Sequence, residues 1–213
     1  MTTTTDTIAR RAVGLFGAGL VALMLAIPAA SDAATSFGAK LTPDIQPSNA
    51  ETAHPCDPNA DEAGEPCTRV LMDAYGRPDQ PNAPKSGKIK RIKLIAGEAG
   101  TFRLQIVKAN PATQQAKLVR NGPVINYQGQ PVLGEEDDPA ESYNVEKFKV
   151  NVKVKKGQYL AIESTETSTM RCSSGGPNQL IFSGPLQLGS PFRSADETDG
   201  CWLLIEARVK SKS

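Results

Sequence analysis

The stretch VEKFKVNVKVKKGQYLAIES, residues 145–164, alternates apolar and charged side chains and then reaches Lys156-Gly157. Successive side chains of a β-strand point to opposite faces, so this alternation predicts a strand with one buried face and one wet face. The glycine predicts a tight turn into a second strand, QYLAIES. The buried face of the first strand should carry Phe148, Val150, Val152 and Val154.

The wet face of this strand carries Lys147, Lys149, Lys153 and Lys155, with Asn151 in the middle of the row. Residues two apart on a strand lie about 6.6 Å apart, so the row should span about 26 Å. Lysines on an outer or edge strand prevent sheets from pairing edge to edge, which is the simpler interpretation. The competing interpretation is a docking stripe for anionic envelope polymers such as teichoic acids. Nucleic acid is disfavoured because no aromatic residues interleave the lysines.

The same period of two recurs along the chain. KIKRIKLIA, residues 88–96, alternates from Arg91 onward, and the out-of-phase Ile89 predicts a bulge near Lys90. TFRLQIVKA, residues 101–109, should place Arg103 and Gln105 outward. Further strands are expected in residues 35–41, 67–75, 178–184 and 201–210.

One further segment, residues 116–128, should form two strands joined by a turn at Asn121-Gly122. No helical periodicity is seen beyond the first 33 residues. Many short strands separated by turn residues predict one all-β domain, either an antiparallel β-sandwich or a barrel. The expected core is Ile92, Leu94, Phe102, Leu104, Ile106, Phe148, Val150, Val152, Val154, Leu160, Ile162 and Trp202.

The first 33 residues are typical of an export signal. Arg10 and Arg11 precede an apolar run at residues 12–27, and Ser31-Asp32-Ala33 offers a cleavage site with small residues. An uncleaved membrane anchor is the alternative. We expect a loop-rich segment at 34–66, with a strand at about 35–41, and the β-domain at 67–210. The mature protein should be secreted or envelope-associated, with no membrane segment left after cleavage.

Four cysteines in an exported chain favour two disulfides, for which three connectivities are possible. Cys56 lies close to Cys67, and Cys172 and Cys201 bracket a later stretch, so Cys56–Cys67 and Cys172–Cys201 are the preferred pairs. The spacings fit no zinc motif. We therefore expect a disulfide-stapled domain.

Several segments, taken in order, resemble a known family: SFGAKL, CTRV, PKSGKIKRIKLIAGEAGTFRLQIVKA, FKVNVKVKKGQYLAIES and CWLLIEARV. They are similar to an uncharacterised family of exported actinobacterial proteins with the patterns G-x-I-x-x-W/I, G-x-x-R-L-x-V and V-K-x-G-D-x-I-G-L. The resemblance covers most of the mature chain and implies a jelly-roll-like β-sandwich with no assigned chemistry. This chain has Gln158 and Ala161 where the pattern favours Asp and Gly.

Few residues suit catalysis. A Ser-His-Asp site needs a histidine, and the sole histidine is His54, in a proline-rich loop. A glycosidase needs two carboxylates that face each other across a cleft. The acidic run Glu135-Glu136-Asp137-Asp138 is expected to repel itself and stay solvated, and Glu163 should point outward from its strand. A carboxylate-dependent hydrolase is kept as the alternative function.

The loop CDPNADEAGEPC could hold calcium, since its oxygen ligands recur at alternate positions. The candidate ligands are Asp57, Asn59, Asp61, Glu62 and Glu65. Glu62 stands where a calcium loop needs its turn glycine, and Thr68 where it needs a bidentate Glu, so a polar surface loop is the simpler interpretation. We expect no other cofactor.

Sugar binding by a sandwich commonly uses exposed aromatic residues. Trp202 is flanked by aliphatic residues and is expected in the core, and nothing clusters Tyr127, Tyr143 and Tyr159. A chain with 24 basic and 23 acidic residues has no global field that would attract nucleic acid or a membrane. The favoured function is a secreted, non-catalytic module that binds an envelope polymer or a surface protein. A purely structural extracellular role is the third possibility.

Overall fold

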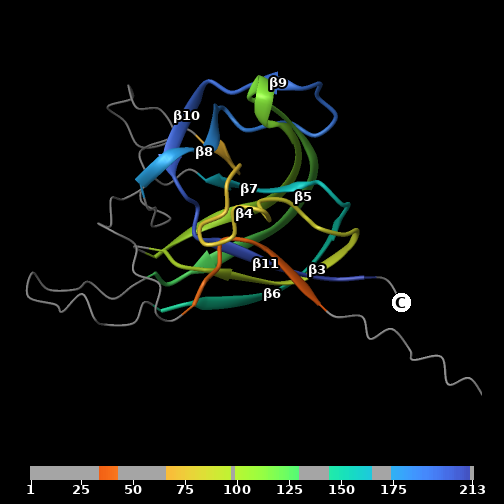
Figure 1. Cartoon of the computed structure of the whole chain (residues 1–213), viewed down its shortest axis with the longest axis vertical. Helices are drawn as coiled ribbons and strands as arrows, with labels where there is room; N and C mark the ends of the chain where they lie inside the picture. Colours follow the sequence, from red (N-terminus) through yellow and green to blue (C-terminus); the bar gives the residue numbers. More distant parts are fainter. Residues whose placement is uncertain (1–33, 43–65, 97–98, 130–143, 165–173, 212–213) are drawn as a thin grey trace, which may run out of the picture. The chain divides into compact units, whose positions relative to one another are not determined.

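The structure, a computed structural model, describes residues 34–42, 66–96, 99–129, 144–164 and 174–211. For residues 174–177 and for Cys201 it describes the backbone alone. The chain divides into two units, Met1–Ser31 and Asp32–Ser213, and every described residue belongs to the second. This unit is built from strands, with one short 3-10 turn at Pro111–Thr113 (Figure 1). None of the described segments is a helix long and apolar enough to cross a membrane.

The first sheet has four antiparallel strands in the order β1-β11-β3-β6. Their bounds are Thr35–Gly38 for β1, Ile205–Lys210 for β11, Gly87–Leu94 for β3 and Glu146–Val154 for β6. β6 is the alternating strand of the opening stretch, and it lies at an edge of this sheet. The predicted turn after it is confirmed, because Gly157 has a φ of 79° and Gln158 N donates to Lys155 O over 3.1 Å.

The second sheet has seven antiparallel strands in the order β10-β8-β2-β7-β4-β5-β9. Their bounds are Glu197–Cys201 for β10, Ser174–Ser183 for β8, Cys67–Leu71 for β2, Tyr159–Ser164 for β7, Gly100–Asn110 for β4, Gln115–Tyr127 for β5 and Arg193–Ser194 for β9. β4 and β5 are the longest strands of the sheet, and they curve strongly in Figure 1. The prediction of an all-β domain with antiparallel sheets is confirmed.

The strand pairs are nested along the sequence. β4 pairs with β5, β3 with β6, β2 with β7, and β1 with β11. Pairs β4–β5 and β2–β7 belong to the second sheet, and pairs β3–β6 and β1–β11 belong to the first. Each pair in this nested series therefore lies in the other sheet from the pair that it encloses. β8 and β10 extend the second sheet beyond β2, and β9 extends it beyond β5.

One apolar cluster joins the two sheets. It contains side chains of β3, β6 and β11 from the first sheet and of β4, β5 and β7 from the second. All but two of the predicted core residues belong to it: Ile92, Leu94, Phe102, Leu104, Ile106, Val150, Val152, Val154, Leu160 and Ile162. Phe148 packs against the cluster but stays partly exposed, since its strand is an edge strand.

The prediction that Trp202 lies in the core is wrong. Residues 202–204 are not part of a strand, and the last strand starts at Ile205. The Trp202 ring is partly exposed and stacks edge-on against Tyr75, with ring centroids 5.4 Å apart. Its indole N–H donates to Asp73 Oδ2 over 3.1 Å. An indole N–H needs a partner when it leaves water, and this carboxylate provides one away from the core.

Part of the outer side of the second sheet is also buried, which the alternation did not predict. Val70, Val107, Leu118, Phe182 and Leu186 are among the residues of a second apolar cluster there. Gln105 lies on this outer side as expected, but it is fully buried rather than wet. Its side chain bonds Thr68 Oγ1 (3.0 Å), Asn121 Oδ1 (3.1 Å) and Glu163 Oε2 (2.7 Å). These partners replace the water that the amide gives up.

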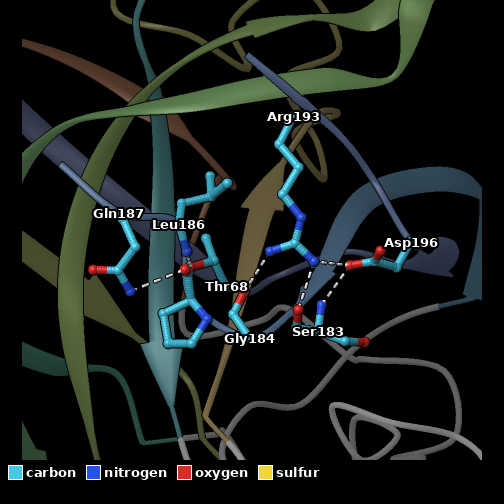
Figure 2. Close-up of polar contacts among 8 residues, drawn as sticks. Thr68, Ser183, Gly184, Leu186, Gln187, Arg193 and Asp196 are labelled. Carbon is cyan, nitrogen blue, oxygen red and sulfur yellow. Dashed lines mark hydrogen bonds and ion pairs between the residues drawn. The ribbon is translucent and has the colours of Figure 1, made fainter. Parts of the chain in front are cut away.

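The loop that follows β8 covers part of this outer cluster through Leu186 (Figure 2). Leu186 N donates to the buried Thr68 Oγ1 over 3.0 Å. Arg193 closes the base of the loop by donating to the carbonyl oxygens of Ser183 (2.6 Å) and Gly184 (2.9 Å) and by pairing with Asp196. The polar contacts in Figure 2 thus fix a surface loop over what would otherwise be an exposed apolar face.

Two local predictions had opposite outcomes. The bulge near Lys90 is confirmed, because the pairing of β3 shifts between Ile89 and Arg91. The prediction of a turn at Asn121-Gly122 is wrong, because both residues lie within the continuous strand β5. A Cβ atom on Gly122 would lie 2.9 Å from Leu104 O, so glycine is needed here for a close approach to β4.

The predicted disulfide pairs are only partly within the described residues. Cys67, in β2, is disulfide-bonded. Cys56 and Cys172 lie outside the described residues, as does the side chain of Cys201, so Cys56–Cys67 and Cys172–Cys201 remain predictions. The predicted signal at 1–33 also lies outside them.

Candidate polyanion-binding face

The four lysines singled out in the sequence share one side of β6 and its continuation. Lys147, Lys149, Lys153 and Lys155 are all exposed, while Val150, Val152 and Val154 between them are buried. β6 pairs with β3 alone among the described strands. The lysine row therefore lies on an edge strand, as edge protection requires.

The neighbouring strand β3 adds a second line of cations. Residues opposite each other in adjacent strands project from the same face of a sheet. Lys88 is opposite Lys153, Arg91 is opposite Lys149, and Lys93 is opposite Lys147. Lys90 sits in the bulge of β3 and donates to Asn151 Oδ1 over 3.0 Å. The lysines of β6 thus face other cations across the strand.

β11 extends these pairs into rows that cross three strands. Lys210 is opposite Lys88, Arg208 is opposite Arg91, and Glu206 is opposite Lys93. The rows are Lys210–Lys88–Lys153, Arg208–Arg91–Lys149 and Glu206–Lys93–Lys147. We call these outward side chains, together with Lys90, the basic face. Two of its three rows contain cations only.

Glu206 is the acid of the basic face, and it is buried rather than displayed. Its side chain is 5% exposed and pairs with Lys93 over 3.1 Å and with Arg77 over 3.4 Å. Ser36 Oγ also donates to it, over 3.2 Å. Among the described residues, no ion pair involves Arg91, Arg208, Lys88, Lys149 or Lys153. Two like charges about 5 Å apart repel by about 0.8 kcal/mol in bulk water, so these rows are predisposed to gather anions.

A cavity of about 290 Å³ opens where one all-cation row ends. Its lining includes Lys88 and Lys153 of that row, together with Arg120 of β5 and Lys155. Val119 and Val154 supply apolar lining, and Ser86 and Gln158 supply polar groups. The positive charge of the basic face thus continues over the end of the domain.

The alternation of KIKRIKL was enough to place Arg91 and Lys93 on a wet side. No local pattern indicates that β3 lies beside β6, because 51 residues separate Leu94 of β3 from Glu146 of β6, and none indicates that β11 completes the rows. Antiparallel partners so distant in sequence are chosen by the packing of the whole domain.

The other sequence-predicted site residues are not brought together. His54, the acidic run 135–138, Tyr143 and the calcium candidates Asp57, Asn59, Asp61, Glu62 and Glu65 lie outside the described residues. The described residues contain no group of three or more His, Cys, Asp or Glu side chains suited to a metal. Tyr127 belongs to the main core and Tyr159 to the outer apolar cluster.

Glu163, the one candidate carboxylate in a described strand, lies on the outer side of β7 as predicted. It accepts a hydrogen bond from Gln105 and lies 3.6 Å from Arg103 Nε. Its neighbours are thus an amide and a guanidinium, both of which donate toward the carboxylate. This arrangement suits a structural ion pair on the surface of the sheet.

A buried ion pair that sequence reasoning missed joins two strands of the second sheet. Arg69 Nη1 lies 3.4 Å from Asp199 Oδ2, and both side chains are almost fully buried. Burial lowers the pKa of the Arg69 guanidinium, and the nearby carboxylates of Asp199 and Glu197 oppose this shift. Gln179 Nε2 also donates to Asp199 Oδ2, over 2.7 Å.

Comparisons of the chain with models of protein families, with curated proteins and with solved structures found no match.

Proposed function

We propose that this protein is an exported, non-catalytic module that binds an anionic cell-envelope polymer through its basic face. The observation that carries the proposal is the pair of all-cation rows, Lys210–Lys88–Lys153 and Arg208–Arg91–Lys149. The whole chain has a formal net charge of +1, so the concentration of cations on one sheet is local. A local positive field of this kind attracts polyanions to one face, while the near-neutral molecule as a whole does not attract anionic surfaces.

The shape of the basic face favours an extended ligand. Strands lie about 4.8 Å apart and residues two apart on a strand about 6.6 Å apart, so the rows form a flat grid of charges. A polymer with regularly spaced phosphates or carboxylates can meet several of these cations at once. Among the described residues, the outward positions of β3, β6 and β11 carry no aromatic side chain on which a base could stack.

The proposal extends to fold and location. The nested strand pairs of eight strands, β1 to β7 and β11, support a jelly-roll sandwich, to which β8, β9 and β10 are additions. Export is supported by the signal-like composition of residues 1–33 and by the disulfide at Cys67. Released and envelope-retained forms are both compatible with these features.

The first test replaces Lys149 and Lys153, the β6 members of the two all-cation rows. K149Q/K153Q should leave the free energy of unfolding within about 0.5 kcal/mol, as for other exposed positions. Each lysine near an anionic surface contributes about 1 kcal/mol, so the double variant should bind cell-wall material about tenfold or more weakly at low salt. Retention by the wild type should fall as salt is raised.

The matched control is K40Q/K108Q, which removes the same charge from exposed lysines outside the basic face. It should keep wild-type retention. A second arm uses wall material stripped of its phosphate polymers, to which the wild type should no longer bind. Equal retention of the wild type and K149Q/K153Q would leave the lysines as edge protection alone.

A further inference from the structure

A second, polar cavity of about 300 Å³ opens on the basic face at the β1 side. It is lined by Ala34, Ser36, Arg77, Arg91, Lys93, Glu206 and Arg208. Four of these side chains are cations from three separate segments of the chain, and one is a carboxylate. The four positive charges outnumber the negative charge by three, in a space large enough for a small anion.

The carboxylate holds two of the cations in place. Glu206 pairs with Lys93 through Oε1 and with Arg77 through Oε2, at 3.1 and 3.4 Å. The 3.4 Å contact joins Arg77 Nη1 to Glu206 Oε2, but it is not a hydrogen bond, and neither of these two buried atoms has a hydrogen-bond partner among the described residues. A buried polar atom without a partner is costly and is commonly completed by water or by a ligand. The cavity thus contains one donor and one acceptor that attract each other as an ion pair and that both retain the capacity for a hydrogen bond.

The two remaining arginines have no partner charge. Arg91 and Arg208 are opposite each other on β3 and β11, and no described ion pair includes either one. Like charges directly opposite each other in a sheet are destabilising. The planar guanidinium group binds two oxygens of one phosphate at once, so a single phosphate can satisfy both arginines.

We propose that this cavity is a binding site for a phosphate group that carries one proton. Arg91 and Arg208 bind its charged oxygens, Arg77 Nη1 donates to a third oxygen, and Glu206 Oε2 accepts the P–OH hydrogen. A sulfate has the same shape but no hydrogen at neutral pH, so its oxygen would face the lone pairs of Glu206. The site therefore selects phosphate over sulfate. Inorganic phosphate and the phosphomonoester end of a polymer share the required chemistry.

The test measures binding of inorganic phosphate and of sulfate to the full protein by calorimetric titration at neutral pH. The wild type should bind phosphate at least about tenfold more tightly than sulfate, the value of one charge-assisted hydrogen bond. E206Q keeps the shape of the side chain but removes its charge and replaces one oxygen with an NH2 donor, which can face a sulfate oxygen, so the two affinities should come within about twofold. A wild type that binds both anions equally, or an E206Q that keeps the preference, would overturn the proposal.

R208Q tests the arginines at an exposed position, where folding is not at risk. It should weaken phosphate binding about tenfold, whereas K108Q, at an exposed lysine outside the basic face, should change it less than twofold. Unchanged phosphate binding by R208Q would also overturn the proposal. Glycerol 3-phosphate and a glycerophosphodiester separate the two sources, because only the monoester can keep a P–OH hydrogen. If neither binds while inorganic phosphate does, the site is for the free ion.

This site goes beyond the polymer-binding proposal and fails separately from it. Loss of wall retention in K149Q/K153Q does not depend on phosphate selectivity, and neither residue lines this cavity. A protein that binds wall polymer but not phosphate refutes the site alone. A protein that selects phosphate but ignores wall polymer refutes the polymer-binding function alone.

Discussion

At the scale of single residues, burial separates two ion pairs that are each formed by an arginine and an aspartate. Arg69–Asp199 has side chains 5% and 12% exposed, while Arg193–Asp196 has side chains 39% and 44% exposed. Taking one partner from a buried pair leaves a charge with little solvent to stabilise it. An exposed charge that loses its partner is screened by water. Burial therefore decides what each pair contributes to stability.

These two pairs give a direct prediction. D199N should lower the free energy of unfolding by about 3 kcal/mol, because the buried Arg69 loses its carboxylate. D196N keeps an oxygen for the Ser183 N–H and should lose about 1 kcal/mol or less. Urea unfolding of both variants measures the difference. Equal losses would mean that solvent reaches Arg69 in the folded protein.

Gly122 shows how one residue can be misread at this scale. Asn-Gly is typical of hairpin turns, and for that reason the sequence predicted a turn. The structure instead uses the missing Cβ to bring β5 close to Leu104 O of β4. Both uses favour glycine, and the sequence alone does not distinguish them.

At the scale of the elements, the position of β6 is compatible with both of the roles that the sequence offered as alternatives. Its lysines lie on an edge strand, where they oppose pairing with another sheet, and they also join the rows of the basic face. The two roles need different properties of the side chain. Edge protection needs polar side chains that oppose pairing with another sheet, whereas polyanion binding needs positive charge.

The edge role can be tested by a change in polarity. K149V/K153V places two β-branched residues on the exposed side of β6 and should increase self-association, measured by light scattering as a function of concentration. K149Q/K153Q is the control, and it should stay as dispersed as the wild type. Association of the glutamine variant to the same degree would show that charge, rather than polarity, protects this edge.

At the scale of the whole molecule, the nested pairs depend on contacts between distant segments. β1 and β11 lie near opposite ends of the described chain yet pair directly. Disulfides that tie loops to strands would limit the unfolded ensemble of such a chain. Because Cys67 is disulfide-bonded, the contribution of disulfides to stability can be measured by comparing the oxidised protein with the reduced protein.

Peptide mapping without reduction should recover Cys56 joined to Cys67 and Cys172 joined to Cys201. Each predicted bond closes a shorter loop than the bonds of either crossed pairing, and closing a shorter loop costs less chain entropy. The measurement is mass spectrometry of the secreted protein after proteolysis. Recovery of Cys56 joined to Cys201 would refute both predicted pairs.

The sequence by itself determined the properties that depend on near neighbours along the chain. Alternation in residues 147–154 was sufficient to separate the buried valines from the exposed lysines, and the phase slip at Ile89 was sufficient to place the bulge. Strand periodicity is local, because each side chain points opposite to the one before it. The all-β class and most of the core follow from this same local rule.

The tertiary structure alone decided which faces meet. The register that places Arg91 between Arg208 and Lys149 joins three strands from distant parts of the chain, and no local pattern encodes it. Whether the outer side of a strand is wet depends on what covers it, and Leu186 and its loop bury the side on which Gln105 was expected to meet water. The basic face and the polar cavity that opens on it exist because packing of the shared core fixes the strand order, and strand order sets which charges become neighbours.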